Sequence, residues 1–168
     1  MMYDLETFSI IDTFTGEAVT GSLRKDAVVL DQVSVVTSTW GDWKRANPET
    51  TIVAEDGGVG RTYVLDPLGG RDDNGPIFPI GDVDERLPVQ EKVLGVIADD
   101  GTPIAFPVAA ARTEIDAGRS VALHDVTLHA DGSGVRARTS DGTDAVGHGA
   151  FWFAWSQFYP DTVVWSAP

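Results

Sequence analysis

The sequence predicts an α+β fold, in which short, mainly antiparallel strands carry two equivalent helices that each contain a Trp-x-x-Trp pattern. Three observations support this class. The apolar runs are short and rich in β-branched residues, turn residues are frequent (18 glycines and 9 prolines), and two aromatic segments have helix start and stop signals. The chain has 168 residues, of which 42% are hydrophobic, so we expect a single domain over residues 1–168.

Two hairpins are the clearest strand signals. Val93–Ile97 and Pro103–Phe106 flank a turn at 99–101, and its Asp-Gly pair favours a tight connection. The second hairpin spans Val126–Thr139 and turns on Asp131–Gly134. Apolar and basic residues alternate after that turn, so one face of the strand is expected to be buried and the other exposed to solvent. Three further β-branched runs are predicted to be strands: Val28–Leu30, Val33–Val36 and Thr51–Val53.

Two segments have the features of helices. Thr39–Ala46 begins with a threonine whose hydroxyl caps the first turn, and Asp42 is placed to reach back as in a capping box. Pro48 ends this helix. Ala150–Phe158 ends before Pro160 and is apolar nearly all round, which predicts a central buried helix.

The two helices belong to a repeated pattern. Its second occurrence follows the first by 112 positions (152 minus 40): Trp40, Trp43, Pro48 and Thr50 recur as Trp152, Trp155, Pro160 and Thr162. The fixed spacing predicts an internal duplication with a pseudo-symmetric core. The tail of the first copy would span about 1–54, an acidic loop rich in Gly, Asp and Pro about 55–88, and the second copy about 89–168.

The tryptophans of this pattern are the predicted centre of the core. Side chains at positions i and i+3 lie on one helix face, and each indole buries on the order of 200 Å². The expected structural core residues are therefore Trp40, Trp43, Trp152 and Trp155. Trp165 lies outside the pattern and is expected to be the more exposed tryptophan.

The charge of the chain is strongly negative. There are 26 acidic residues against 12 basic ones, a net charge of −14. Such a field repels nucleic acids and anionic lipid surfaces, so neither is an expected partner. Aspartates outnumber glutamates by 19 to 7 and only 3 of the basic residues are lysines, a composition that suits concentrated salt. We therefore hypothesise a halophilic origin, with an ordinary acidic protein as the alternative.

Several other classes of protein are excluded or disfavoured by composition. The absence of cysteine excludes disulfides, thiol catalysis and cysteine-ligated metals. No apolar run approaches the roughly 20 residues of a membrane span, so no membrane insertion is expected. Met1–Leu5 has no signal-peptide features. The chain as written is expected to be cytoplasmic, and export is the alternative if it is part of a longer protein.

Stretches along nearly the whole chain carry a family resemblance. They are Met2–Asp4, Thr15–Ala18, Thr39–Trp40 with Trp43, Asp66-Pro67, Arg86–Pro88, Lys92–Val96, Phe106-Pro107, Ala150–Trp155 and Tyr159–Thr162. With these blocks the chain resembles the domain of unknown function family DUF3179. The resemblance implies that full-length members contain two repeats, of which this chain has the tail of the first and the second. It also implies that many members are exported. Members carry an upstream Cys-Pro-x-Cys-Gly element that is absent here, and the family has no activity to transfer.

Candidate chemistry is confined to carboxylates and three histidines. The acidic loop offers oxygen ligands of the kind that calcium prefers, without EF-hand spacing. The calcium candidates are Asp66, Asp72, Asp73, Asp82 and Asp84. The histidines, His124, His129 and His148, are not spaced to converge on a metal, and Ser156 lies within an aromatic helix rather than in a nucleophile motif. Gly57–Gly60 lacks the residues of a phosphate loop. We predict no catalytic or cofactor-binding residue.

Three hypotheses for the function follow. The first is a non-enzymatic binding or structural module, because no catalytic signature accompanies the aromatic core. The second is an enzyme, or the remnant of one, that uses carboxylates of the 66–86 loop together with a divalent cation. The third is a piece that associates with a missing upstream half. The identity of a small-molecule or protein partner is left open by the sequence.

Overall fold

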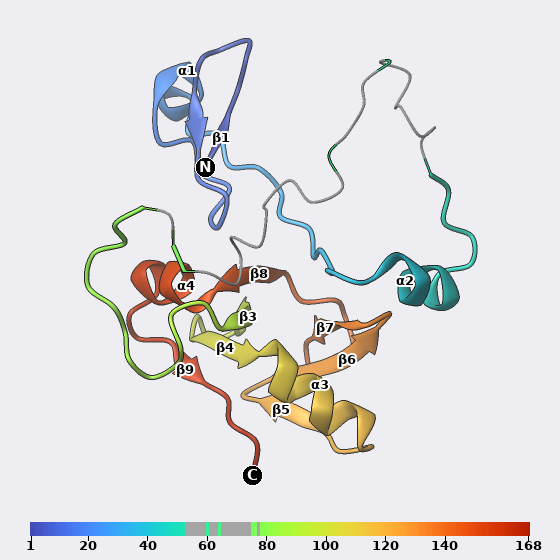
Figure 1. Ribbon diagram of the computed structural model, residues 1–168. Coiled ribbons are helices and arrows are strands. Elements are labelled where there is room, and N and C mark those ends of the chain that lie inside the picture. The colour runs from blue at the N-terminus through green and yellow to red at the C-terminus, as the bar shows by residue number, and fades with distance from the viewer. Residues whose placement is uncertain (53–59, 61–63, 65–74, 77) are drawn as a thin grey trace. The chain divides into compact units, whose positions relative to one another are not determined.

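The computed structural model describes residues 1–52, 60, 64, 75–76 and 78–168 (Figure 1). Four helices and nine short, mainly antiparallel strands lie in this part of the chain, which confirms the α+β class. Contacts divide the chain into two units, Met1–Ser34 and Val35–Pro168, which are described separately. The predicted division into repeat copies stays a prediction.

The first unit is a small arrangement of turns around one strand pair. Strand β1 (Met2–Tyr3) pairs antiparallel with β2 (Ile10–Ile11), and helix α1 spans Gly21–Lys25. The predicted strand at Val28–Leu30 is wrong, because Val29 makes only an isolated bridge with Glu17. Such a short element has too few partners to form a ladder.

A four-stranded sheet is the centre of the second unit. Its strand order is β8-β3-β4-β9, with β3 at Lys92–Ile97, β4 at Pro103–Pro107, β8 at Gly147–Phe151 and β9 at Val163–Val164. The β3–β4 hairpin confirms the prediction from the Asp-Gly turn. All pairs are antiparallel except β4–β9.

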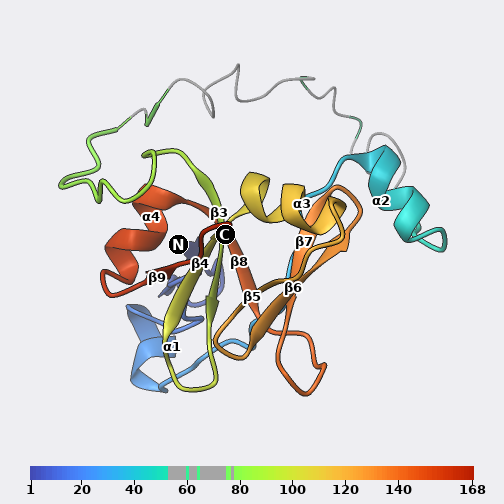
Figure 2. The ribbon, with the colours of Figure 1, turned by 90° about the horizontal axis from the view of Figure 1, so that it is seen from below.

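Helix α4 (Trp152–Phe158) covers one face of this sheet, while a second sheet and α3 cover the other (Figure 2). Gly95 of β3 lies beneath the Trp155 ring. The helix begins two residues later than predicted, because Ala150 and Phe151 pair with β3. Its burial is also one-sided rather than complete, since Phe158 is 46% exposed.

The opposite face packs against strands β5 (Val121–Leu123), β6 (Val126–Asp131) and β7 (Gly134–Arg138) and helix α3 (Val108–Asp116). The β6–β7 hairpin and its alternation are as predicted. Trp165 was expected to be exposed, and this is wrong. Trp165 is only 7% exposed. Its backbone N–H donates to the Ala105 carbonyl, which holds the C-terminal segment beside β4, and its ring centre lies 6.3 Å from that of Phe106.

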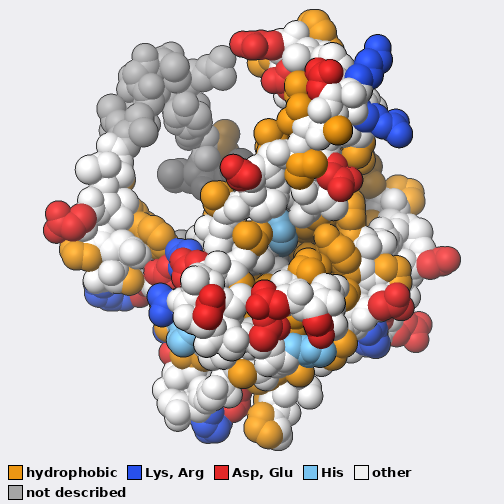
Figure 3. Space-filling model, turned by 180° about the vertical axis from the view of Figure 1, so that it is seen from behind, with side chains coloured by type: hydrophobic (Ala, Val, Ile, Leu, Met, Phe, Trp, Pro, Cys, Tyr) orange, Lys and Arg blue, Asp and Glu red, His pale blue; other side chains and the backbone are white. Residues whose placement is uncertain are grey.

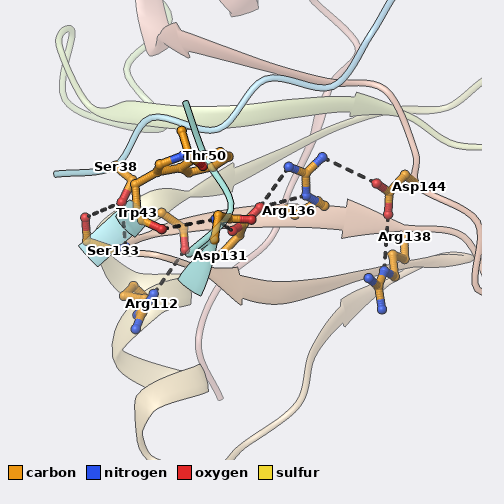
Figure 4. Close-up of polar contacts among 11 residues, drawn as sticks. Ser38, Trp43, Thr50, Arg112, Asp131, Ser133, Arg136, Arg138 and Asp144 are labelled. Carbon is orange, nitrogen blue, oxygen red and sulfur yellow. Dashed lines mark hydrogen bonds and ion pairs between the residues drawn. The ribbon is translucent and has the colours of Figure 1, made fainter. Parts of the chain in front are cut away.

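Helix α2 (Trp40–Ala46) lies against the β6–β7 turn (Figure 4). The Thr39 hydroxyl accepts the Asp42 N–H and donates to the Asp42 carboxylate, so the predicted cap is present. Ser38 and Ser133 are joined at 3.1 Å between their hydroxyls, and the Asn47 amide donates to Asp131. These contacts anchor the segment before and after α2 to the hairpin.

The two Trp-x-x-Trp helices share local structure but not surroundings. Each has seven residues, and the residues that follow them, Asn47 and Tyr159, have nearly the same backbone angles (φ −129°, ψ 71° and 75°). Trp152 is completely buried, whereas its counterpart Trp40 is 50% exposed. Trp40 is therefore half-exposed rather than a core residue, because no sheet formed by the described residues lies under α2 as the four-stranded sheet lies under α4. The duplication itself stays a prediction.

Two further strand predictions fail or fall outside the description. Val33–Val36 has no ladder partner among the described residues and forms no strand. Thr51 and Ile52 are also irregular, and Val53 lies outside the described residues. A β-branched run becomes a strand only when a partner edge is available to it.

Candidate functional site: a groove between two strand edges

A groove of about 410 Å³ opens beside β7 and β8 within the second unit. Its size falls in the range of about 300–1,000 Å³ that is usual for ligand sites. The lining comes from the sheet, the start of α3, the β6–β7 turn and the segment before α2: Val35, Thr37, Lys92–Leu94, Val108, Ser133–Val135 and Gly149–Phe151. Apolar side chains dominate this lining, and of the described residues in it only Lys92 is titratable.

The groove lies where β7 and the chain leading into β8 separate beyond an isolated bridge between Arg138 and Asp144. The Thr139 N–H donates to the Thr143 carbonyl at 3.0 Å, and the Ala145 N–H to the Ala137 carbonyl at 3.0 Å. These two bonds flank an isolated antiparallel bridge between Asp144 and Arg138 at the end of β7. In this register, the next bonded pair would join Val135 to Gly147, and among the described residues that pair is not formed. From this point the two strands diverge.

Gly149 has no side chain and leaves open space in the groove. A Cβ built on Gly149 meets nothing within 4 Å, although the residue lies in the middle of β8. Gly149 is opposite Leu94 in the ladder, so both lie on the sheet face that carries the main core. The groove is therefore an opening toward that core.

A polar network lies on the solvent face of β7 (Figure 4). Arg136 donates to Asp131 at 2.8 Å and contacts Asp144 at 3.3 Å, and Arg138 contacts the same Asp144 carboxylate at 3.2 Å. On the other side of the hairpin, Arg112 donates to the backbone carbonyls of its turn. Every charge drawn here has an opposite charge or a hydrogen bond, so the network fixes the hairpin and offers no free reactive group.

The carboxylates predicted as calcium ligands are not brought together by the described residues. Asp66, Asp72 and Asp73 lie outside them, as do Gly57 and Gly58 of the glycine-rich run. Asp84 is bonded by the Arg86 guanidinium, which holds the pKa of that carboxyl below its usual value. The backbone carbonyl of Asp82 accepts from Gln157.

Arg86 links Asp84 to the second tryptophan helix. Its guanidinium donates to the carbonyls of Thr162 at 2.5 Å and Pro160 at 3.0 Å, and lies 5.1 Å above the Trp152 ring. The Trp152 Nε1–H donates to the Asp84 carbonyl at 2.9 Å. These contacts clamp the end of α4, so Asp84 and Arg86 have a structural role that the sequence did not reveal.

The histidines lie apart. His124 Nδ1 is 3.4 Å from the Asp100 carboxylate, His129 is exposed on β6, and the His148 ring stacks near Trp155 with 6.3 Å between ring centres. Among the described residues no group of three or more potential ligands is able to hold a metal ion. Ser156 is buried in α4, in keeping with packing rather than nucleophilic chemistry.

Asp141 gives a pH-dependent prediction. Its carboxylate accepts bonds from the Thr139 hydroxyl at 2.6 Å and from the N–H and hydroxyl of Thr143, and these bonds lower its pKa to about 2. The stabilisation is therefore complete above the ordinary pKa of 3.8 and is lost as the pH falls through about 2. We expect Asp141→Asn to lower the urea midpoint at pH 7 and to differ progressively less from the wild type between pH 4 and pH 2. A constant difference over that range would show that the charge is not the cause.

The described helices include none that combines the length and the apolar character needed to cross a membrane. Comparison with protein-family models matches residues 1–141 to the family described as "Protein of unknown function (DUF3179)". Neither curated proteins nor solved structures gave a significant match. The family match confirms the resemblance seen in the sequence and covers most of the chain. The chain therefore belongs to the DUF3179 family of proteins of unknown function.

Proposed function

We propose that the chain is a non-enzymatic binding module whose site is the groove between β7 and β8. The observation that carries this proposal is the groove itself, an apolar opening toward the core beyond the Arg138–Asp144 bridge. Among the described lining residues, Lys92 is the only titratable one. An apolar ligand would bury the mainly apolar lining.

Gly149→Val tests this proposal. The strand tolerates a β-branched residue, and the new side chain would occupy open space in the groove. We expect the neutral dye Nile red to bind the wild type saturably at one site per chain, and Gly149→Val to bind it at least about tenfold more weakly. Fluorescence titration measures both.

The matched control is Ala122→Val, which adds a similar side chain at an exposed position of β5 outside the groove. It should bind the dye as the wild type does. Equal dye binding by wild type and Gly149→Val would rule out the groove as the site.

A second candidate function rests on the exposed face of α2. Helix α4 buries its tryptophans against a sheet, while Trp40 of α2 is 50% exposed and Ile52, shortly after the helix, is 73% exposed. A large exposed indole on a helix of the same local geometry favours docking onto a further polypeptide. We propose that this polypeptide is the upstream half that the family resemblance implies.

A fusion protein tests the docking of α2. The chain would be joined to the preceding repeat of a longer family member, and acrylamide quenching of Trp40 would be obtained from the difference between wild type and Trp40→Phe. Quenching of Trp40 should fall in the fusion protein. Unchanged quenching would contradict the proposal.

We also propose that the acidic surface is adapted to high salt, and Asp99 provides the test. Acidic side chains are spread over the face shown in Figure 3. Repulsion by Asp125 is the largest of the effects that raise the pKa of Asp99 in the folded state. At a pH above this pKa, the ionised Asp99 carboxylate therefore destabilises the folded state. We expect Asp99→Asn to raise the melting temperature in dilute buffer at pH 7. The gain should vanish in 1 M KCl, where the screening length is about 3 Å, and KCl should raise the melting temperature of the wild type.

The control for this prediction is Asp31→Asn, which removes the same charge from the other unit. An equal gain from Asp31→Asn would assign the effect to net charge instead of the Asp99–Asp125 pair. A wild-type melting temperature that does not rise in KCl would refute the adaptation to salt.

A further inference from the structure

The two strands that flank the groove expose unpaired backbone groups toward it. Directly after β8, the Trp152 N–H donates to the Glu91 carbonyl at 2.8 Å, so every second residue of β8, counted back from Trp152, is hydrogen-bonded to β3. In this alternation, Gly147 and Gly149 direct their N–H and C=O groups away from β3, as Phe151 does its N–H. No β-ladder partner on that side is found for Gly147 and Gly149 among the described residues.

The edge of β7 that faces the groove also carries unpaired backbone groups. The carbonyl of Ala137 points away from β6, since it accepts the Ala145 N–H. By alternation, Val135 points its backbone groups the same way, and in the described part of the chain they have no partner there. Val135 also lines the groove, so the cavity is bounded by two open strand edges.

We infer that the groove binds an extended peptide, which adds as a strand to the β8 edge and faces β7 on its other side. Backbone groups of open strand edges pair with extended chains, because such a chain offers N–H and C=O groups at the matching spacing. A compact apolar ligand would cover the lining and leave these groups unpaired. Since β7 and β8 run antiparallel, the added strand is parallel to one and antiparallel to the other.

The side chains of this peptide follow from the lining and the charge. Alternate residues face the apolar floor that includes Leu94 and Val108, so apolar or β-branched residues are expected at every second position. The net charge of −14 repels acidic peptides. The bound peptide is therefore neutral or basic. This inference rests on the proposed function, because it identifies the class of ligand taken by the same groove.

The experiment uses ¹⁵N-labelled full-length chain and the capped peptide Lys-Val-Thr-Val-Thr-Val-Lys. The expected result is a shift of the amide signals of Gly147, Gly149 and Phe151, with hydrogen exchange at these amides slowed at least about tenfold at saturation. The same peptide with alternate N–H groups methylated cannot form the ladder, and should bind at least about tenfold more weakly.

The outcomes separate this inference from the proposed function. Equal binding of the methylated peptide, or binding of Nile red without any binding of the peptide, would overturn strand addition and leave an apolar groove. Binding of neither probe would overturn both. Shifts of the same amides with rising chain concentration, in the absence of peptide, would identify a second copy of the chain as the occupant and overturn the inference.

Discussion

Trp155→Ala is expected to lower the free energy of unfolding by about 3–5 kcal/mol. The indole is fully buried, lies against Gly95 of β3, and has its ring centre 4.5 Å from that of Tyr159. Truncation would leave a large cavity between α4 and the sheet, since both walls are held by other contacts. Urea unfolding followed by circular dichroism measures the loss.

Trp40→Ala is the matched control, because it makes the same truncation in a helix of the same length. With half of its surface exposed, Trp40 should contribute less than about 1 kcal/mol. Equal losses at the two positions would contradict the difference in burial. If Trp155→Ala has no cooperative transition, Trp155→Phe retains part of the packing and should show an intermediate loss.

The fold could be predicted where the signal was local. The Asp-Gly turn before Thr102 and the turn at Gly132-Ser133 each determine a hairpin from adjacent residues, and both hairpins are present. The cap at Thr39 is equally local. Local chemistry selects one conformation for a few residues without reference to the remainder of the chain, which is why these predictions succeeded.

Predictions that depended on distant partners were less successful. Val28–Leu30 has β-branched residues but forms no ladder with the described residues, because propensity supplies no partner edge. The pattern of Trp40 and Trp43 predicted a helix correctly, yet burial depends on what lies opposite that helix. Trp165 lies outside the Trp-x-x-Trp pattern and was therefore expected to be exposed. The parallel pairing of the C-terminal segment with β4 buries it.

The groove was not predicted from the sequence, although one signal was present. Gly147-His148-Gly149 places two glycines on the same side of a strand, directly before the predicted helix at Ala150–Phe158. A glycine in a strand indicates either a close neighbour or an open space. The structure contains both cases, since a Cβ at Gly147 would contact Leu94 and one at Gly149 would contact nothing.

Gly95→Ala is the second large effect, and we expect a loss of about 1–3 kcal/mol. Gly95 is a β3 residue whose Cβ, if present, would overlap the Cε3, Cδ2 and Cζ3 atoms of Trp155. The contact involves a rigid ring and the middle of a central strand, so neither side is able to yield at low cost. Equilibrium unfolding in urea measures the change.

A double-mutant cycle shows whether the ring is the cause of that loss. In a Trp155→Leu background the overlapping atoms are gone, so Gly95→Ala should cost much less there than in the wild type. Gly149→Ala, in the neighbouring strand, adds the same methyl group to open space and should be nearly neutral. A cost at Gly95 that is unchanged in the Trp155→Leu background would place its origin in the strand itself. The close packing of α4 on β3 would then not be what requires a glycine at this position.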